Sequence, residues 1–136
     1  MVIAQPSPIA FNVAGPPAVK GSTFSFLDRR GRLVTKQDSK NGKAWAASVA
    51  WSARQAGIAI IPKGIGVIVS VEYAFATPRR AGRACPCVRP DVDKLARALL
   101  DALTGVAYED DGQVVALTVR KLYEADTVTR VWVDRV

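Results

Sequence analysis

Residues 89–103 read RPDVDKLARALLDAL, and this stretch predicts a helix with one apolar and one charged side. Pro90 cannot continue a helix from upstream, so the helix is expected to run from about Asp93 to residue 104. At about 100° per residue, the leucines and alanines of the stretch fall on one continuous arc. The narrow opposite face carries four charged residues, Asp93, Lys94, Arg97 and Asp101.

Segments of other periodicity flank this helix on both sides. We expect strands at residues 9–13, 22–27, 33–35, 65–75, 113–123 and 127–136, and an alanine-rich helix over residues 43–55. The order is therefore strand, hairpin, helix, strand, helix, hairpin, with residues 124–126 as the turn of the last hairpin. This order predicts a single α+β domain over residues 1–136, a mixed β-sheet with two main helices packed on it.

The charge of the chain excludes some functions and favours others. Nineteen Lys and Arg outnumber twelve Asp and Glu, which gives a net charge of +7 and favours an anionic partner. With no His in the sequence, His-based catalysis and His metal ligands are excluded. No glycine-rich phosphate loop is present, so no nucleotide cofactor is expected. We expect no membrane association and a cytoplasmic location, because the chain has neither a long apolar run nor a secretory signal pattern.

A second acidic segment follows the charged helix. Residues 108–115 read YEDDGQVV, an acidic turn that leads straight into a strand. If that strand packs against the helix, Asp110 or Asp111 could meet Asp91 and Asp93 at the helix N-terminus. Simpler interpretations remain open: a capped helix start, a solvated face, or a ladder of ion pairs along the helix.

Converging carboxylates repel one another unless a cation neutralises them. Mg²⁺ favours hard oxygen ligands and usually takes one or two carboxylates together with substrate phosphate. Such a site can activate water and stabilise the charge on a phosphate undergoing cleavage. Lys94 or Arg97 could offset that charge or protonate the leaving oxygen, and guanidinium is the poorer acid of the two. Cys85 and Cys87, two residues apart in an Arg-rich loop, are assigned no role.

Three motifs at this spacing resemble the RusA family of Holliday junction resolvases. They are Pro90-Asp91-Val92-Asp93-Lys94-Leu95, then Leu100-Asp101-Ala102-Leu103, then Asp110-Asp111-Gly112-Gln113-Val114. The resemblance implies a dimeric, Mg²⁺-dependent endonuclease, with Mn²⁺ as a substitute ion, that makes paired symmetric nicks in four-way DNA junctions. It makes Asp91, Asp93 and Asp111 the essential acidic residues, with Asp110 beside them. The family's functional lysine falls on Arg97 and its asparagine on Lys94, which leaves open which cation serves the site.

The basic loops gain a role under the same resemblance. They would bind DNA phosphates without regard to sequence, through Lys20, Arg29, Arg30, Arg32, Arg79, Arg80 and Arg83. The setting would be DNA recombination, DNA repair or the processing of phage DNA. Two alternatives stay open: a catalytically weak or inactive relative that only binds branched DNA, and a metal-dependent RNase that uses the same carboxylates.

Overall fold

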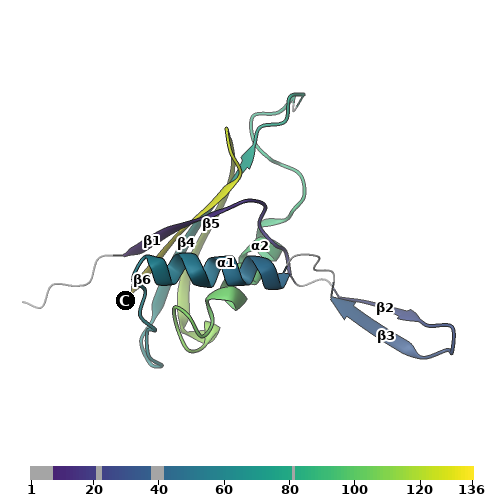
Figure 1. Cartoon of the computed structure of the whole chain (residues 1–136), viewed down its shortest axis with the longest axis horizontal. Coiled ribbons are helices and arrows are strands. Elements are labelled where there is room, and N and C mark those ends of the chain that lie inside the picture. Colours follow the sequence, from purple (N-terminus) through teal and green to yellow (C-terminus); the bar gives the residue numbers. More distant parts are fainter. Residues whose placement is uncertain (1–7, 21–22, 38–41, 81) are drawn as a thin grey trace, which may run out of the picture.

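A computed structural model of the chain describes residues 8–20, 23–37, 42–80 and 82–136 (Figure 1). Two helices cover one face of a four-stranded sheet, and a two-stranded hairpin projects from this body. The elements are β1 (Ile9–Ala14), β2 (Thr23–Leu27), β3 (Leu33–Gln37), α1 (Gly42–Gln55), β4 (Val67–Ala76), α2 (Val92–Leu103), the short 3-10 helix η1 (Asp111–Gln113), β5 (Val114–Glu124) and β6 (Val128–Arg135). Each predicted helix and strand is present within two residues of its expected bounds, which confirms the α+β class with a mixed sheet.

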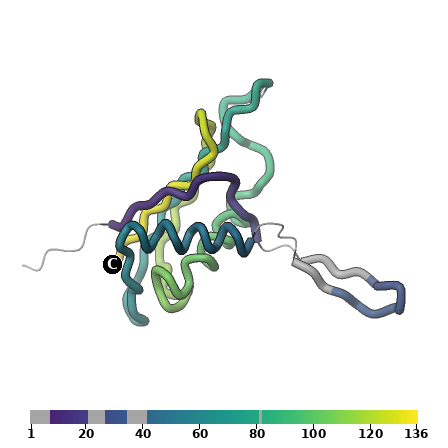
Figure 2. The backbone as a smooth tube through the Cα atoms, viewed as in Figure 1, coloured from purple at the N-terminus to yellow at the C-terminus, as the bar shows by residue number. Residues whose placement is uncertain are grey.

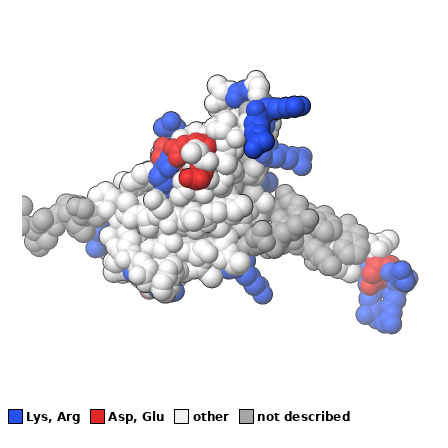
Figure 3. Space-filling model, turned by 45° about the horizontal axis from the view of Figure 1, so that its top comes forward, with Lys and Arg blue, Asp and Glu red and all other residues white. Residues whose placement is uncertain are grey.

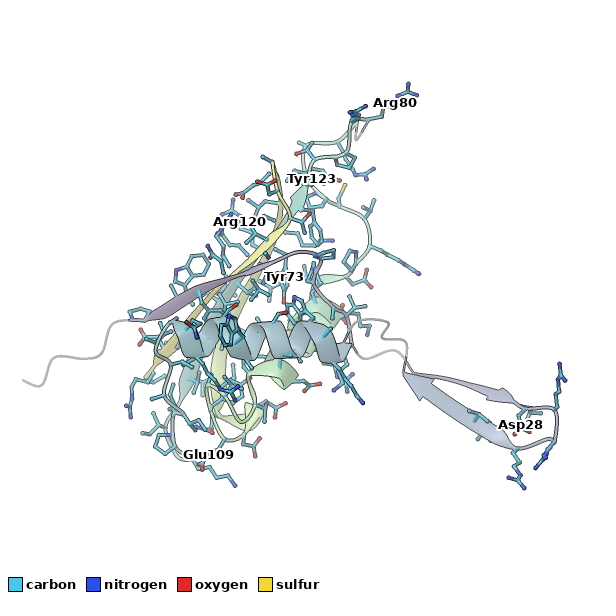
Figure 4. All side chains as sticks on the ribbon, in the orientation of Figure 1. Asp28, Tyr73, Arg80, Glu109, Arg120 and Tyr123 are labelled. Carbon is cyan, nitrogen blue, oxygen red and sulfur yellow. The ribbon has the colours of Figure 1, made fainter. Side chains whose placement is uncertain are left out.

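Strand β4 is the centre of the sheet, whose strand order is β1-β6-β4-β5. Its alternate residues Val67, Val69, Val71 and Tyr73 are buried under the helices. The apolar arc of α2 packs on this face, and its three deepest side chains are Leu95, Leu99 and Leu103. Full burial of each such side chain contributes about 1.5–3 kcal/mol, so this layer contributes substantially to stability. The Tyr73 hydroxyl donates a hydrogen bond to the Leu95 carbonyl oxygen, 3.0 Å away, and fixes α2 over β4 (Figure 4).

The expected closing hairpin is wrong. Strands β5 and β6 follow each other in the chain but do not pair, because β4 lies between them, parallel to β5 and antiparallel to β6. The connection passes over the end of β4: the Thr77 N–H donates to the Glu124 carbonyl oxygen, and the Ala76 N–H donates to the Thr127 hydroxyl. An apolar strand buried under helices gains more from partners on both edges than from lying at the side of the sheet. As a result β5 is an edge strand, next to α2.

Helix α1 ends as its sequence predicts. Gly57 follows it with φ +84°, a conformation that glycine adopts without the Cβ clash of other residues. The chain path in Figure 2 then runs through a loop to β4, and a second long loop leaves the far end of β4 before α2 begins. No helix in the described parts of the chain has the length and apolar character needed to cross a bilayer.

Candidate active site

An open hollow lies between the charged face of α2, the edge strand β5 and the turn that precedes it. It measures about 490 Å³ and is lined by Lys20, Asp93, Ala96, Arg97, Leu100, Asp101, Asp111 and Leu117. We call it the carboxylate hollow. Three of its lining residues are aspartates and two are cations, so it joins the two acidic segments that stand out in the sequence.

The acidic turn approaches α2 from the C-terminal end of the helix. The chain leaves α2 at its C-terminal end and returns through η1 into β5, so Asp111 approaches the half of the helix that carries Asp101. Tyr108 lies between the two segments, buried, and its hydroxyl donates to the Leu100 carbonyl oxygen at 2.7 Å. Burial raises the pKa of Tyr108, and the nearby charges of Asp111 and Asp101 raise it further. Asp111 nevertheless lines the same hollow as Asp93, so the expected approach of the acidic turn to the carboxylates at the start of α2 is found for this pair.

Asp91 and Asp93 lie at the start of α2 with exposed carboxylates. Asp91 occupies the position before the first helical residue, yet its side chain makes no capping hydrogen bond. The simpler interpretation of Asp91 as a helix cap is thus not confirmed. The Lys94 ammonium lies 3.2 Å from the Asp93 carboxylate, and this hydrogen bond holds the pKa of Asp93 below its usual value. Asp93 is consequently ionised at neutral pH and available as an oxygen ligand.

The adjacent aspartates of the acidic turn have different surroundings. The Asp110 carboxylate accepts a hydrogen bond from the Gly112 N–H at 2.9 Å, which lowers the pKa of Asp110. It caps η1 and lines a separate hollow on the side of Lys63. Asp111, by contrast, lines the carboxylate hollow. The structure therefore brings Asp93 and Asp111 to one cavity and leaves Asp91 and Asp110 outside its lining.

Gln113 fixes this turn, a role that was not predicted from the sequence. Its amide oxygen accepts hydrogen bonds from the backbone N–H groups of Glu109 and Asp110, at 3.0 and 2.9 Å. Its amide nitrogen lies within 3.1 Å of three carbonyl oxygens in the loop before β4, those of Ile61, Pro62 and Ile65. The Glu109 carboxylate accepts a bond from the Lys63 N–H of the same loop at 2.7 Å, and Figure 4 shows Glu109 at that end of the molecule. Together these bonds clamp the acidic turn to the loop before β4.

Lys121 has a comparable role at the other end of α2. Its ammonium donates to the carbonyl oxygens of Val88 and Pro90, at 2.7 and 2.8 Å. The edge strand β5 is thus tied to the segment that leads into Asp91. The sequence contains a signal for this role: Lys121 alternates with Val119 and Tyr123, so it lies on the apolar side of the strand, where a lysine needs hydrogen-bond partners.

The charged residues of α2 do not form a ladder of ion pairs along the helix, which was one of the simpler interpretations of the sequence. Asp101 pairs with Lys20, whose ammonium is 2.8 Å from its carboxylate, and Asp93 pairs with Lys94. Within the described ranges Arg97 makes no ion pair, although it lines the carboxylate hollow. Lys20, which we predicted to contact DNA phosphates, lines the carboxylate hollow.

Positive side chains gather at two extremities of the molecule, the hairpin tip and the loop after β4 (Figure 3). At the hairpin tip the Asp28 carboxylate accepts hydrogen bonds from the N–H groups of Arg30 and Arg32, both 2.9 Å, so the turn uses the acid and leaves the arginine side chains exposed. The predicted phosphate-binding residues Arg29, Arg30, Arg32, Arg79, Arg80 and Arg83 are all exposed. Arg80 points away from its loop into solvent (Figure 4). Arg83, by contrast, donates a hydrogen bond to the Tyr123 hydroxyl at 2.9 Å. Cys85 and Cys87 of the same loop are free and exposed.

The carboxylates that the structure describes do not form a ready-made metal cluster. Among the residues that the structure describes, no group of three Asp, Glu, Cys or His side chains lies close enough together to hold an ion. The expected convergence of three or four carboxylates is therefore wrong for this chain on its own. The donor set of the hollow nevertheless fits Mg²⁺, which takes one or two carboxylates, keeps several waters and draws further oxygens from a phosphate substrate.

Two comparisons with known proteins found similarity over most of the chain. A family model described as "Endodeoxyribonuclease RusA" matches residues 18–134. The chain is also 30% identical to the uncharacterized protein YqaN of Bacillus subtilis (strain 168), across 94% of this chain and 96% of that protein. The family match spans all three motifs, both helices and the strands β2 to β5. The chain therefore belongs to the RusA endodeoxyribonuclease family.

Proposed function

We propose that the protein is a Mg²⁺-dependent endonuclease that resolves four-way DNA junctions by paired symmetric nicks. The supporting observation is the carboxylate hollow, which places Asp93 and Asp111 together with Lys20 and Arg97 on an open surface. Membership of an endodeoxyribonuclease family supports the cleavage of a DNA backbone. DNA recombination, DNA repair and phage DNA processing are the settings in which four-way junctions need such an activity.

Asp93 and Asp111 are the proposed ligands of the ion, with Asp91 and Asp110 within one or two residues of them in the chain. When bound, Mg²⁺ would lower the pKa of a water and neutralise charge on the scissile phosphate, and Mn²⁺ favours the same oxygen ligands. A site with few protein carboxylates suits a metal that is completed by substrate, because each phosphate oxygen replaces a missing ligand. Arg97, which lines the hollow with no ion pair among the described residues, would bind a phosphate oxygen there.

The exposed arginines would hold the arms of the substrate. Arg29, Arg30 and Arg32 at the hairpin tip and Arg79 and Arg80 on the loop after β4 would contact phosphates without regard to base sequence. We propose that two copies of the chain form a homodimer. A two-fold dimer presents two hollows to a four-way junction whose arms share that symmetry, and this matches paired nicks.

One assay tests the proposal. The protein is incubated with a four-way junction, the matching linear duplex and single-stranded RNA, each with Mg²⁺, with Mn²⁺ and with EDTA. We expect symmetric nicks in the junction that require the metal. Binding of the junction without cleavage would identify an inactive relative, and faster cleavage of RNA would identify an RNase. Junction cleavage in EDTA would overturn the metal mechanism.

A further inference from the structure

Two cations line the carboxylate hollow, and they differ in chemistry. Arg97 projects from the charged face of α2, and Lys20 reaches the hollow from the segment after β1. The Lys20 ammonium lies 2.8 Å from the Asp101 carboxylate, and each side chain is about a third exposed, at 37% and 35%. Lys94 is not a lining residue, and its ammonium is engaged by Asp93.

The chain holds Lys20 at this place by its backbone as well as by the ion pair. The Lys20 N–H donates to the Lys94 carbonyl oxygen in the first turn of α2, at 3.1 Å. Ala18, two residues earlier, is buried in the core. A lysine on a solvated loop would have neither restraint. The segment after β1 is therefore packed on α2 and presents the ammonium to the cavity that holds Asp93 and Asp111.

Cleavage of a phosphodiester bond leaves a sugar oxygen that must receive a proton. A guanidinium is too weak an acid to give up its proton in a protein, whereas an ammonium can. We propose, on the basis of the function proposed above, that Lys20 is the proton donor to the leaving oxygen. Asp101 is then the positioning residue that holds the ammonium in the hollow.

Bonds and protons are conserved in this step, with solvent as the proton source and sink. The oxygen–phosphorus bond to the attacking water forms while the phosphorus–oxygen bond to the leaving sugar oxygen breaks. The water loses one proton to solvent, and Lys20 transfers one proton from Nζ to the leaving oxygen. Lys20 then regains a proton from solvent, so the enzyme returns to its starting state with no net change.

The test separates proton donation from charge. Lys20→Arg retains the positive charge and a hydrogen-bond donor for Asp101 but supplies no proton to the leaving oxygen. Lys20→Ala removes the charge, the donor and the proton. Each variant is assayed on a normal four-way junction and on one whose leaving oxygen, identified from the product ends of the wild-type reaction, is replaced by bridging sulfur. A thiolate leaves without a proton because a thiol is far more acidic than a sugar hydroxyl.

We expect Lys20→Arg to cleave the normal junction about 100-fold or more slowly than wild type, the usual size of a general-acid contribution. On the bridging-sulfur junction we expect its rate to approach that of wild type. Near-normal cleavage of the normal junction by Lys20→Arg would overturn the proposal and leave Lys20 a purely electrostatic role. An equal loss on both junctions would also overturn it.

Two further measurements keep the result from being ambiguous. Thermal unfolding and binding of an uncleaved junction in Ca²⁺ are measured for each variant, and we expect Lys20→Arg to match wild type in both. A large fall in the melting temperature would show that Lys20 has a structural role, and a large fall in junction affinity would show that it is a phosphate ligand. Either result would contradict the proposal. If the wild-type protein cleaves no DNA with any metal, the endonuclease proposal fails first, and the role of Lys20 fails with it.

Discussion

Replacement of Gln113 by glutamate is expected to destabilise the protein in a way that acid reverses. The amide nitrogen of Gln113 meets three carbonyl oxygens, and its amide oxygen meets two N–H groups. A glutamate retains one acceptor but turns a second, negatively charged oxygen toward the three carbonyls. The site is thus built for a group that is a donor on one side and an acceptor on the other.

The expected loss of stability in Gln113→Glu follows from the hydrogen bonds that the substitution removes. The bonds to Ile61 and Ile65 are partly buried, and each contributes about 1 kcal/mol, while the exposed bond to Pro62 contributes less because water replaces it. With repulsion added, we expect Gln113→Glu to lower the free energy of unfolding by about 2–3 kcal/mol at pH 7. For a domain of this size that corresponds to a fall of roughly 10 °C in the melting temperature.

The pH dependence distinguishes this mechanism from simple loss of contacts. Three carbonyl oxygens favour the protonated form of the introduced carboxyl in the folded state of Gln113→Glu, so they raise its pKa. Stability relative to wild type should therefore be greatest below the usual glutamate pKa of about 4.3 and should fall as pH rises through the raised value. Thermal unfolding from pH 4 to pH 8 measures the difference, and Gln113→Met, which has neither donor nor acceptor, is the control. Equal stability of wild type and Gln113→Glu at pH 7, or a constant difference across this range, would refute the reasoning.

Three further predictions concern the acidic residues. We expect Asp93→Asn to reduce Mg²⁺-dependent junction cleavage by more than about 100-fold, beyond the usual loss from an outer-shell change, while junction binding stays equal or tightens; loss of binding in a gel-shift assay would contradict this. We expect Asp111→Asn to lose cleavage without loss of stability, whereas Asp110→Ala lowers the melting temperature and Asp110→Asn, which keeps an acceptor for the turn, does not; calorimetry and nuclease assays on the three variants decide this. The hydrogen bond from Arg130 lowers the pKa of Glu124. The stabilisation of the fold by this pair is therefore present at neutral pH and disappears as pH falls below the usual glutamate pKa. The difference in melting temperature between wild type and Glu124→Gln should accordingly shrink toward about pH 3, and a difference that persists there would rule out the ion pair as its cause.

Local patterns predicted the elements of this fold well because each depends on nearby residues. The apolar arc of α2 predicts a helix from residues a few positions apart, and the glycine after α1 predicts where that helix ends. The pairing of the strands was not predictable in the same way. Nothing within residues 114–135 indicates that β4 separates β5 from β6, because that arrangement follows from the burial of β4 and the short passage over its end.

The site shows the same division between local and distant information. The charged face of α2 follows from its helical period, so the chemistry of Asp93 and Arg97 could be proposed from sequence. Lys20 lies far from them in the chain, and only the packing of its segment on α2 brings it to the hollow. A basic residue near other basic residues is normally interpreted as a surface contact, and no sequence pattern indicated that this one has an acidic partner.

The acidic turn explains how neighbouring aspartates can have separate functions. A tight turn before a strand needs an acceptor for its free N–H groups, and Asp110 meets that need through Gly112. Gln113 satisfies the N–H groups of Glu109 and Asp110, so these two groups need no acceptor from Asp111. Its carboxylate is consequently left to line the hollow. A paired aspartate motif in such a turn therefore supplies one residue that builds the site and one that can bind a ligand, which neither residue could do alone.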